Sequence, residues 1–268
     1  MSWEDTVAQI ERLNVVPKLI GLDSTESTNT VAMSMAQQGA PSGTVVLAQQ
    51  QHRGRGRMGR EWSALPGEHI YLSVVWRPPW PAERASQLTL DAAVSVARCV
   101  ERWIDGRPRL KWPNDVLIDG RKCAGLLGEM RASSSALDFV VMGIGLNVDA
   151  VAHALPESLS SIATAIGDHS KAAVRRQDVA CSLVSELHTG YNALLKRGRF
   201  DREGWCSYAE TLGEEVRVTL PGGSSFVAIA ETLSETGTLV VRKSDGALLD
   251  VVAGDVVVQR GGTHAAGC

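Results

Sequence analysis

Arginine and glycine alternate in the segment Gly54 to Arg60, which reads Gly-Arg-Gly-Arg-Met-Gly-Arg and is followed by Trp62. Glycine lets a backbone approach a ligand closely and turn its N–H groups toward an anion. Arginine adds fixed, bidentate donors that suit phosphate or carboxylate. We expect this loop to surround an anion and to become ordered when the anion binds. From composition alone, a solvated basic loop and a segment that binds single-stranded nucleic acid remain alternatives.

Two lysines flank a Trp-Pro turn farther along the chain, in Lys111-Trp112-Pro113-Asn114-Asp115 and then Lys122. Lys122 precedes a run of small residues that enters a predicted buried strand, where a lysine requires an anionic partner. We expect Lys122 to point into a pocket and to neutralise the negative charge of a reacting carboxylate or phosphate. A simple β-hairpin with ordinary turn residues is the alternative for this motif.

Two further polar groups have a structural and a functional interpretation. Ser27, Thr28 and Asn29 are good helix N-cap residues, or they hold the head of a small neutral ligand. Asn147 ends the apolar strand that contains Gly143-Ile144-Gly145, where it either closes a turn or forms hydrogen bonds with an adenine edge. A third glycine at dinucleotide-binding spacing is absent from this strand, which argues against a Rossmann site.

Composition excludes several classes of function. The 268 residues carry a net charge of −3, so anion binding must come from a local cluster rather than from a basic chain. The five cysteines are scattered without a C-x-x-C spacing, which favours a reducing cytoplasm over a disulfide framework or a zinc knuckle. The N-terminus lacks signal-peptide features, and the apolar runs are too short to span a membrane. The histidines show no metal spacing, and no Walker A, H-E-x-x-H or G-x-S-x-G motif is present.

Hydrophobic periodicity predicts an α+β chain in which these segments lie between regular elements. We expect helices over residues 3–13, 27–38, 88–104 and 173–195, and strands over 18–22, 44–48, 70–76, 109–112, 116–118, 124–130 and 139–148. After residue 212, five short strands (215–220, 226–231, 239–243, 248–252 and 256–259) predict a small β-barrel. We therefore predict domains at 1–211 and 212–260, and a disordered tail at 261–268.

Taken in this order, the segments resemble the biotin–protein ligase family, from about Lys18 to Asn147 and more weakly through the C-terminal strands. The combination of G-R-G-R-x-G-R, K-W-P-N-D and a G-x-G-L-N strand carries the resemblance. It implies a mixed sheet with flanking helices, like the catalytic domain of class II aminoacyl-tRNA synthetases, and an SH3-like C-terminal barrel. It further implies ATP-dependent formation of biotinyl-5′-AMP, assisted by Mg2+, and transfer of biotin to a lysine of a biotin carboxyl carrier protein.

The resemblance also implies a set of site residues. Lys122 and Arg57 would be catalytic, with Lys122 contacting the biotin carboxylate and the α-phosphate. The biotin-binding residues would be Ser27, Thr28, Asn29, Gln51, Arg55, Gly56, Arg57 and Lys122. The ATP-binding residues would be Arg57, Trp62, Lys111, Asn114 and Asn147, with Asn147 against the adenine and Trp62 closing that side. The resemblance assigns no metal ligand.

Some positions depart from the family pattern. His52 and Arg53 precede the loop where relatives often have a small residue, which would alter loop mobility or retention of the adenylate. Cys123 stands where leucine is common, which we expect to change packing only. The segment 1–17 is too short for a winged helix, so we expect a ligase without repressor activity and without a DNA partner. The oligomeric state stays open between a monomer and a weak homodimer.

Two rival functions remain. A lipoate–protein ligase is the nearest alternative within the enzyme class, because it shares the catalytic architecture. A nucleic-acid-binding module that uses the arginine–glycine loop is the alternative from a different class.

Overall fold

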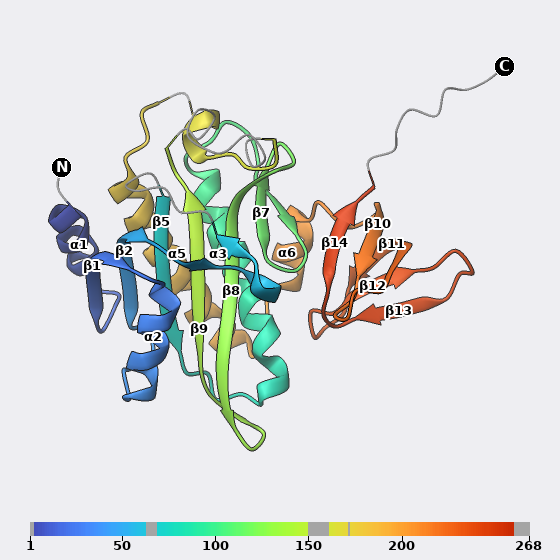
Figure 1. Ribbon diagram of the computed structural model, residues 1–268, viewed down its shortest axis with the longest axis horizontal. Helices are drawn as coiled ribbons and strands as arrows, with labels where there is room; N and C mark the ends of the chain where they lie inside the picture. The colour runs from blue at the N-terminus through green and yellow to red at the C-terminus, as the bar shows by residue number, and fades with distance from the viewer. Residues whose placement is uncertain (1–2, 63–68, 150–160, 171, 260–268) are drawn as a thin grey trace.

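A seven-stranded mixed sheet forms the centre of the larger part of the molecule (Figure 1). The structure is a computed structural model that describes residues 3–62, 69–149, 161–170 and 172–259. The strand order is β1-β2-β5-β9-β8-β7-β6, with β1 and β2 parallel and the other neighbours antiparallel. The strands are β1 Leu19–Thr25, β2 Val45–Gln51, β5 His69–Trp76, β6 Arg109–Lys111, β7 Asp115–Ile118, β8 Arg121–Ser133 and β9 Ala136–Asn147.

Helices cover both faces of this sheet (Figure 1). Helix α2 (Thr28–Gln37) packs its alanines, Ala32 and Ala36, on one face. Helices α1 (Trp3–Arg12), α3 (Ala85–Glu101) and α5 (Arg176–Arg197) pack on the opposite face, where the main hydrophobic core lies. Because side chains alternate along a strand, β5 sends Ile70 and Leu72 to that core and Val75 toward α2. The predicted mixed sheet with flanking helices is confirmed.

The arginine–glycine segment has more regular structure than its sequence predicted. Strand β3 (Gly54–Arg55) pairs antiparallel with β4 (Glu61–Trp62), and a 3-10 turn over Arg57–Gly59 joins them. The turn closes because Met58 and Gly59 adopt left-handed backbone angles, with φ of 55° and 75°. The segment is therefore a tight hairpin that follows directly after β2 in the chain.

Five antiparallel strands form the C-terminal part, on the right of Figure 1. They are β10 Glu215–Thr219, β11 Ser225–Leu233, β12 Leu239–Arg242, β13 Leu248–Val251 and β14 Asp255–Val258, in the order β13-β12-β11-β10-β14. All five predicted strands are thus confirmed, as one sheet with β13 and β14 at its edges. The SH3-like closure and the domain limits stay predictions, and the predicted tail 261–268 lies outside the described residues.

The two parts contact each other through the Trp-Pro turn. Trp112 is buried, and its indole Nε1 donates to the carbonyl of Gly237 over 3.2 Å. The short helix α6 (Arg202–Tyr208), which was not predicted from the sequence, precedes β10 and is capped by the Asp201 side chain. Within the described ranges, no helix combines the length and apolar character needed to cross a membrane.

Candidate active site

A cavity of about 340 Å³ lies between the β3–β4 hairpin, the sheet and the C-terminal part. Every site residue predicted from the sequence lines it except Asn147. These residues are Ser27, Thr28, Asn29, Gln51, Arg55, Gly56, Arg57, Trp62, Lys111, Asn114 and Lys122. The fold therefore brings residues from widely separated motifs to one place, with a volume suited to a small organic ligand.

Hydrogen bonds link the polar residues at one end of the cavity. The backbone N–H and the hydroxyl of Thr28 donate to Gln51 Oε1 over 2.9 and 3.2 Å. Ser73 Oγ on β5 lies 2.7 Å from Thr28 Oγ1 and 2.6 Å from Asn29 Oδ1. Ser27 is the N-cap residue of α2, as its residue type predicted, but its side chain makes no capping hydrogen bond. Ser73 was not predicted, because one serine in an alternating strand carries no distinctive signal.

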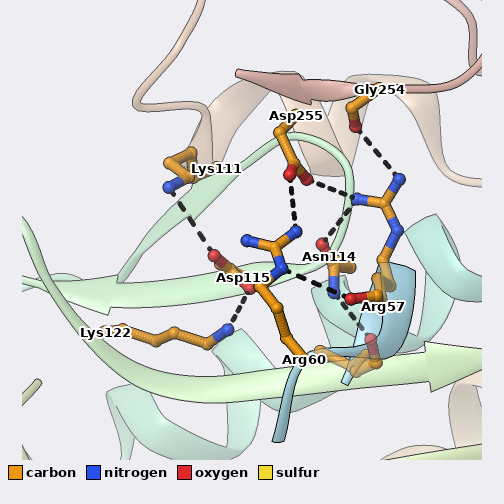
Figure 2. Close-up of polar contacts among 9 residues, drawn as sticks. Arg57, Arg60, Lys111, Asn114, Asp115, Lys122, Gly254 and Asp255 are labelled. Atoms are coloured by element: carbon orange, nitrogen blue, oxygen red, sulfur yellow. Dashed lines mark hydrogen bonds and ion pairs between the residues drawn. The ribbon is translucent and has the colours of Figure 1, made fainter. Parts of the chain in front are cut away.

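Lys122 and Lys111 share one carboxylate at the other end (Figure 2). Lys122 Nζ lies 2.6 Å from Asp115 Oδ1, and Lys111 Nζ lies 3.6 Å from Asp115 Oδ2. This anionic partner is the one that the position of Lys122 required. Asp115 belongs to the Lys-Trp-Pro-Asn-Asp motif but was not predicted as a site residue.

The arginines of the hairpin are paired in the same way (Figure 2). Arg57 and Arg60 contact the two carboxylate oxygens of Asp255 at 3.4 and 2.6 Å. Arg57 also donates to Asn114 Oδ1 over 3.2 Å and to the Gly254 carbonyl over 3.0 Å. Burial lowers the pKa of the Arg57 guanidinium, and the charge of Asp255 opposes that effect. Asp255 ties the hairpin to the C-terminal part of the chain.

The indole ring of Trp62 packs against the backbone of two glycines, Gly125 on β8 and Gly145 on β9. A Cβ added to Gly145 would lie 2.4 Å from Trp62 Cε2, and one added to Gly125 would lie 2.8 Å from Trp62 Cζ3. Lys122 Nζ stands 5.4 Å from the centroid of the indole ring. Only glycine allows an aromatic ring to approach two strands this closely. The surface of β8 and β9 above these two paired glycines can therefore accommodate a flat ring.

Asn147 lies apart from the other predicted residues. Its side chain is 4% exposed, and its Nδ2 donates to the carbonyl of Thr164 over 2.9 Å. It shares the sheet face of Gly143 and Gly145 because side chains alternate along β9. The structure thus does not bring this amide to the cavity lining.

The residues that depart from the family pattern are also located. His52 Nε2 lies 2.5 Å from Ser24 Oγ, and Arg53 lies 4.0 Å from Glu26. Cys123 is fully buried, and burial raises the pKa of its thiol above the usual value. No group of three histidine, cysteine or acidic side chains gathers as a metal site in the part of the chain that the structure describes.

The fold and the cavity define a protein with a small-molecule site that is lined in part by an arginine–glycine hairpin. Comparison with known families makes the assignment specific. Residues 21–147 match the Biotin/lipoate A/B protein ligase family, and residues 211–258 match the Biotin protein ligase C terminal domain. The chain belongs to the biotin protein ligase family.

Individual relatives agree with this assignment. The chain is 37% identical to a biotin–[acetyl-CoA-carboxylase] ligase of Mycobacterium tuberculosis over 87% of its own length and 86% of the relative. It is 34% identical to a bifunctional ligase/repressor of Bacillus spizizenii over 85% of its own length and 70% of the relative. The structure of an Aquifex aeolicus biotin protein ligase in complex with biotin and ATP superposes with a TM-score of 0.74. It is 26% identical to the chain and covers 91% of it and 100% of the Aquifex chain.

Proposed function

We propose that this chain joins biotin and ATP into biotinyl-5′-AMP and transfers the biotin to a lysine of a biotin carboxyl carrier protein. The observation that carries the proposal is one cavity of about 340 Å³ that is lined by Lys122, Arg55 and Arg57. The same cavity is lined by a polar cluster, which consists of Ser27, Thr28, Asn29 and Gln51. Relatives named as biotin–[acetyl-CoA-carboxylase] ligases support biotin over lipoate as the substrate. The Aquifex relative with bound biotin and ATP supports ATP as the second substrate.

In the first step, a biotin carboxylate oxygen attacks the α-phosphorus of ATP, and the bond to the departing pyrophosphate breaks. This step brings two anions together, so the site must supply fixed positive charge. We assign that role to Lys122, at the biotin carboxylate and the α-phosphate, and to Arg57. Asp115, 2.6 Å from Lys122 Nζ, orients the amine.

The remaining residues hold the substrates. We place the neutral ureido ring of biotin against Ser27, Thr28, Asn29 and Gln51, and the hairpin residues Arg55 and Gly56 over it. On the ATP side we assign Trp62, Lys111, Asn114 and Asn147. Asn147 has the donor and acceptor that an adenine edge requires, but its buried amide donates to the Thr164 carbonyl and lies outside the cavity lining, so it must be reoriented to reach the adenine. In the second step the carrier lysine attacks the mixed anhydride and AMP leaves.

We propose that Mg2+ reaches the site with the triphosphate. Magnesium is commonly held by one or two carboxylates together with substrate phosphates. Asp115 lines the cavity, but its two oxygens already contact Lys111 and Lys122, so the phosphate oxygens of the triphosphate would supply most of the ligands of the ion. The ion would neutralise charge on the departing pyrophosphate.

We also propose the finer features of the fold and of the setting. The catalytic domain, residues 1–211, is class II synthetase-like, and residues 212–260 form an SH3-like barrel. The four cysteines within the described residues are all free, which fits a reducing cytoplasm. Glu129 pairs with Arg55, and Asp255 pairs with both Arg57 and Arg60, so the net charge of this hairpin is lower than its sequence suggests, which favours a small ligand over nucleic acid.

The test is incubation of the protein with ATP, Mg2+ and either radiolabelled biotin or radiolabelled lipoate. We expect an adenylate with biotin alone, and labelling of a carrier domain when one is added. An adenylate formed only with lipoate would overturn the proposal. Tight, steeply salt-dependent oligonucleotide binding without biotin binding would favour the nucleic-acid alternative.

A further inference from the structure

We propose that Glu129 is a positioning residue that holds Asn29 of the polar cluster and Arg55 of the hairpin in fixed relation to each other. The inference rests on the proposed function, because it takes Asn29 as part of the biotin pocket and Arg55 as part of the cover. Glu129 lies on β8, beyond the stretch that pairs with β7. It belongs to none of the motifs that indicated the site.

A single oxygen of Glu129 accepts hydrogen bonds from both residues. Asn29 Nδ2 and Arg55 Nη2 each donate to Glu129 Oε2 over 2.8 Å. Asn29 belongs to α2, on one side of the cavity, and Arg55 belongs to β3, in the hairpin beside it. Both bonds gain strength from the charge of the carboxylate. The oxygen therefore joins the polar cluster directly to the hairpin.

The Asn29 amide has one orientation because both of its ends are engaged. Nδ2 also donates to the carbonyl of Leu127 over 3.3 Å, while Oδ1 lies 2.6 Å from Ser73 Oγ. A Cβ on Gly143 would lie 2.1 Å from Oδ1, so the amide fits against a bare backbone. An amide offers two donors and one acceptor. Both acceptors for Asn29 Nδ2, the Leu127 carbonyl and the Glu129 carboxylate, lie on β8, so Oδ1 must face Ser73. Glu129 is one of the two groups that fix this orientation.

The ion pair between Arg55 and Glu129 positions the hairpin more than it stabilises the fold. The side chains of Arg55 and Glu129 are 44% and 28% exposed, and pairs this exposed contribute little to folding. However, Arg55 precedes Gly56 and Arg57, which line the cavity. Holding the Arg55 guanidinium therefore restricts where the next two residues lie.

Another acid–arginine pair at the base of the hairpin provides a matched control. Glu26 and Arg53 are 4.0 Å apart, with side chains 71% and 78% exposed. Their separation and exposure leave little interaction after solvent screening. Glu26→Gln makes the same chemical change as Glu129→Gln, without the contact to Asn29.

The experiment compares adenylate formation by the wild type, Glu129→Gln and Glu26→Gln. For Glu129→Gln we expect the KM for biotin to rise about five- to tenfold, with kcat and the melting temperature close to wild type. In an Arg55→Ala background the same change should raise KM only about twofold, because one of the two donors is already gone. Glu26→Gln should match wild type.

Three results would overturn the assignment. They are an unchanged KM in Glu129→Gln, an equal rise in Glu26→Gln, or a lower melting temperature without a selective effect on KM. A wild-type protein that makes no biotinyl adenylate would overturn the proposed function and the Glu129 assignment together. An active wild type with an unaffected Glu129→Gln variant would overturn the Glu129 assignment alone.

Discussion

Each cation that we place at the reacting groups has a carboxylate partner within the protein. Asp115 lies between Lys111 and Lys122, and Asp255 lies between Arg57 and Arg60. These carboxylates fix the directions in which their partners point. A substrate anion that enters the cavity therefore competes with carboxylates for oriented cations.

Lys122→Ala tests the charge assigned to the reacting centre. The variant should form biotinyl adenylate about 100- to 1,000-fold more slowly, because a preorganised charge at the transition state is lost. The fold should persist, since the Lys122 side chain is 35% exposed and Lys111 still contacts Asp115. Single-turnover formation of adenylate from labelled ATP measures the effect.

The control for Lys122→Ala is Lys18→Ala, which removes an exposed lysine away from the cavity lining. It should behave like wild type. A wild-type rate of adenylation in Lys122→Ala would contradict the role given to this lysine.

At the residue scale, the sequence predicted the cations but not their partners. Motif spacing identified Arg57 and Lys122, since glycine–arginine repeats and an isolated lysine before a buried strand are unusual. Glu129 and Asp255 are ordinary acids in strands, 74 and 198 residues away from the arginines they bind. Only the folded chain brings such distant residues together, so no local pattern could have identified them.

At the scale of elements, the β3–β4 hairpin is held from two sides. Glu129 of β8 holds Arg55, while Gly254 and Asp255 at the start of β14 hold Arg57. The hairpin thus connects the sheet to the C-terminal part. We expect retention of the adenylate to depend on both connections, because a cover must exclude water until the carrier lysine arrives.

Arg57→Gly removes the contacts of this side chain with Asn114, Gly254 and Asp255. We expect the adenylate to escape and to label bystander lysines about tenfold more than wild type does. Biotinylation of an added protein that is not a carrier, detected with streptavidin, measures the escape. Unchanged selectivity for the carrier would contradict the role of the hairpin.

Asp255→Asn weakens the same connection from the other side. Arg57 keeps the Gly254 carbonyl and Asn114, so we expect a smaller increase in bystander labelling, about threefold. Asp250→Asn, on the exposed face of β13, is the matched control and should match wild type. Equal bystander labelling by Asp255→Asn and Asp250→Asn would argue against a connection between the hairpin and the C-terminal part through Asp255.

Periodicity predicted most of the elements that position the site. The strands over 70–76 and 139–148 and the five C-terminal strands all appear in the structure near their expected bounds. The hairpin was missed because glycine and arginine carry no hydrophobic period. Helix α6 was missed because it has only seven residues and depends on an Asp201 cap.

At the scale of the whole molecule, two buried groups on opposite faces of the sheet respond oppositely to pH. Burial raises the pKa of Asp91 to about 6 and lowers the pKa of His69 to about 4. The contribution of Asp91 to stability is complete below about pH 3.8 and is lost as the pH rises through 6. The contribution of His69 is complete above about pH 6.5 and is lost as the pH falls toward 4.

Asp91→Asn should remove the pH-dependent contribution of Asp91 to stability and leave that of His69. Asp91 Oδ1 accepts from Arg197 and from the Asp201 backbone, each over 2.8 Å, and an asparagine oxygen can accept both bonds. The free energy of unfolding of the variant, relative to wild type, should increase between pH 4 and 6 by at most about 3 kcal/mol. Urea denaturation across that range measures it, and parallel curves for the two proteins would contradict the assignment.

The packing of the C-terminal part against the sheet could not be predicted from the sequence. It depends on single contacts such as the Trp112 indole at the Gly237 carbonyl and Arg57 at Asp255. The partner residues Gly237 and Asp255 look ordinary in their own segments. Together they close one side of the cavity, so the site belongs to the whole molecule.

The central claim is that the cavity holds biotin and ATP with their reacting groups at Lys122. A crystal structure with biotin and a non-hydrolysable ATP analogue tests it most directly. We predict the biotin carboxylate and the α-phosphate within hydrogen-bond distance of Lys122 Nζ, and the ureido ring against Thr28 and Asn29. Ligands bound outside this cavity, or a biotin carboxylate directed away from Lys122, would contradict the account.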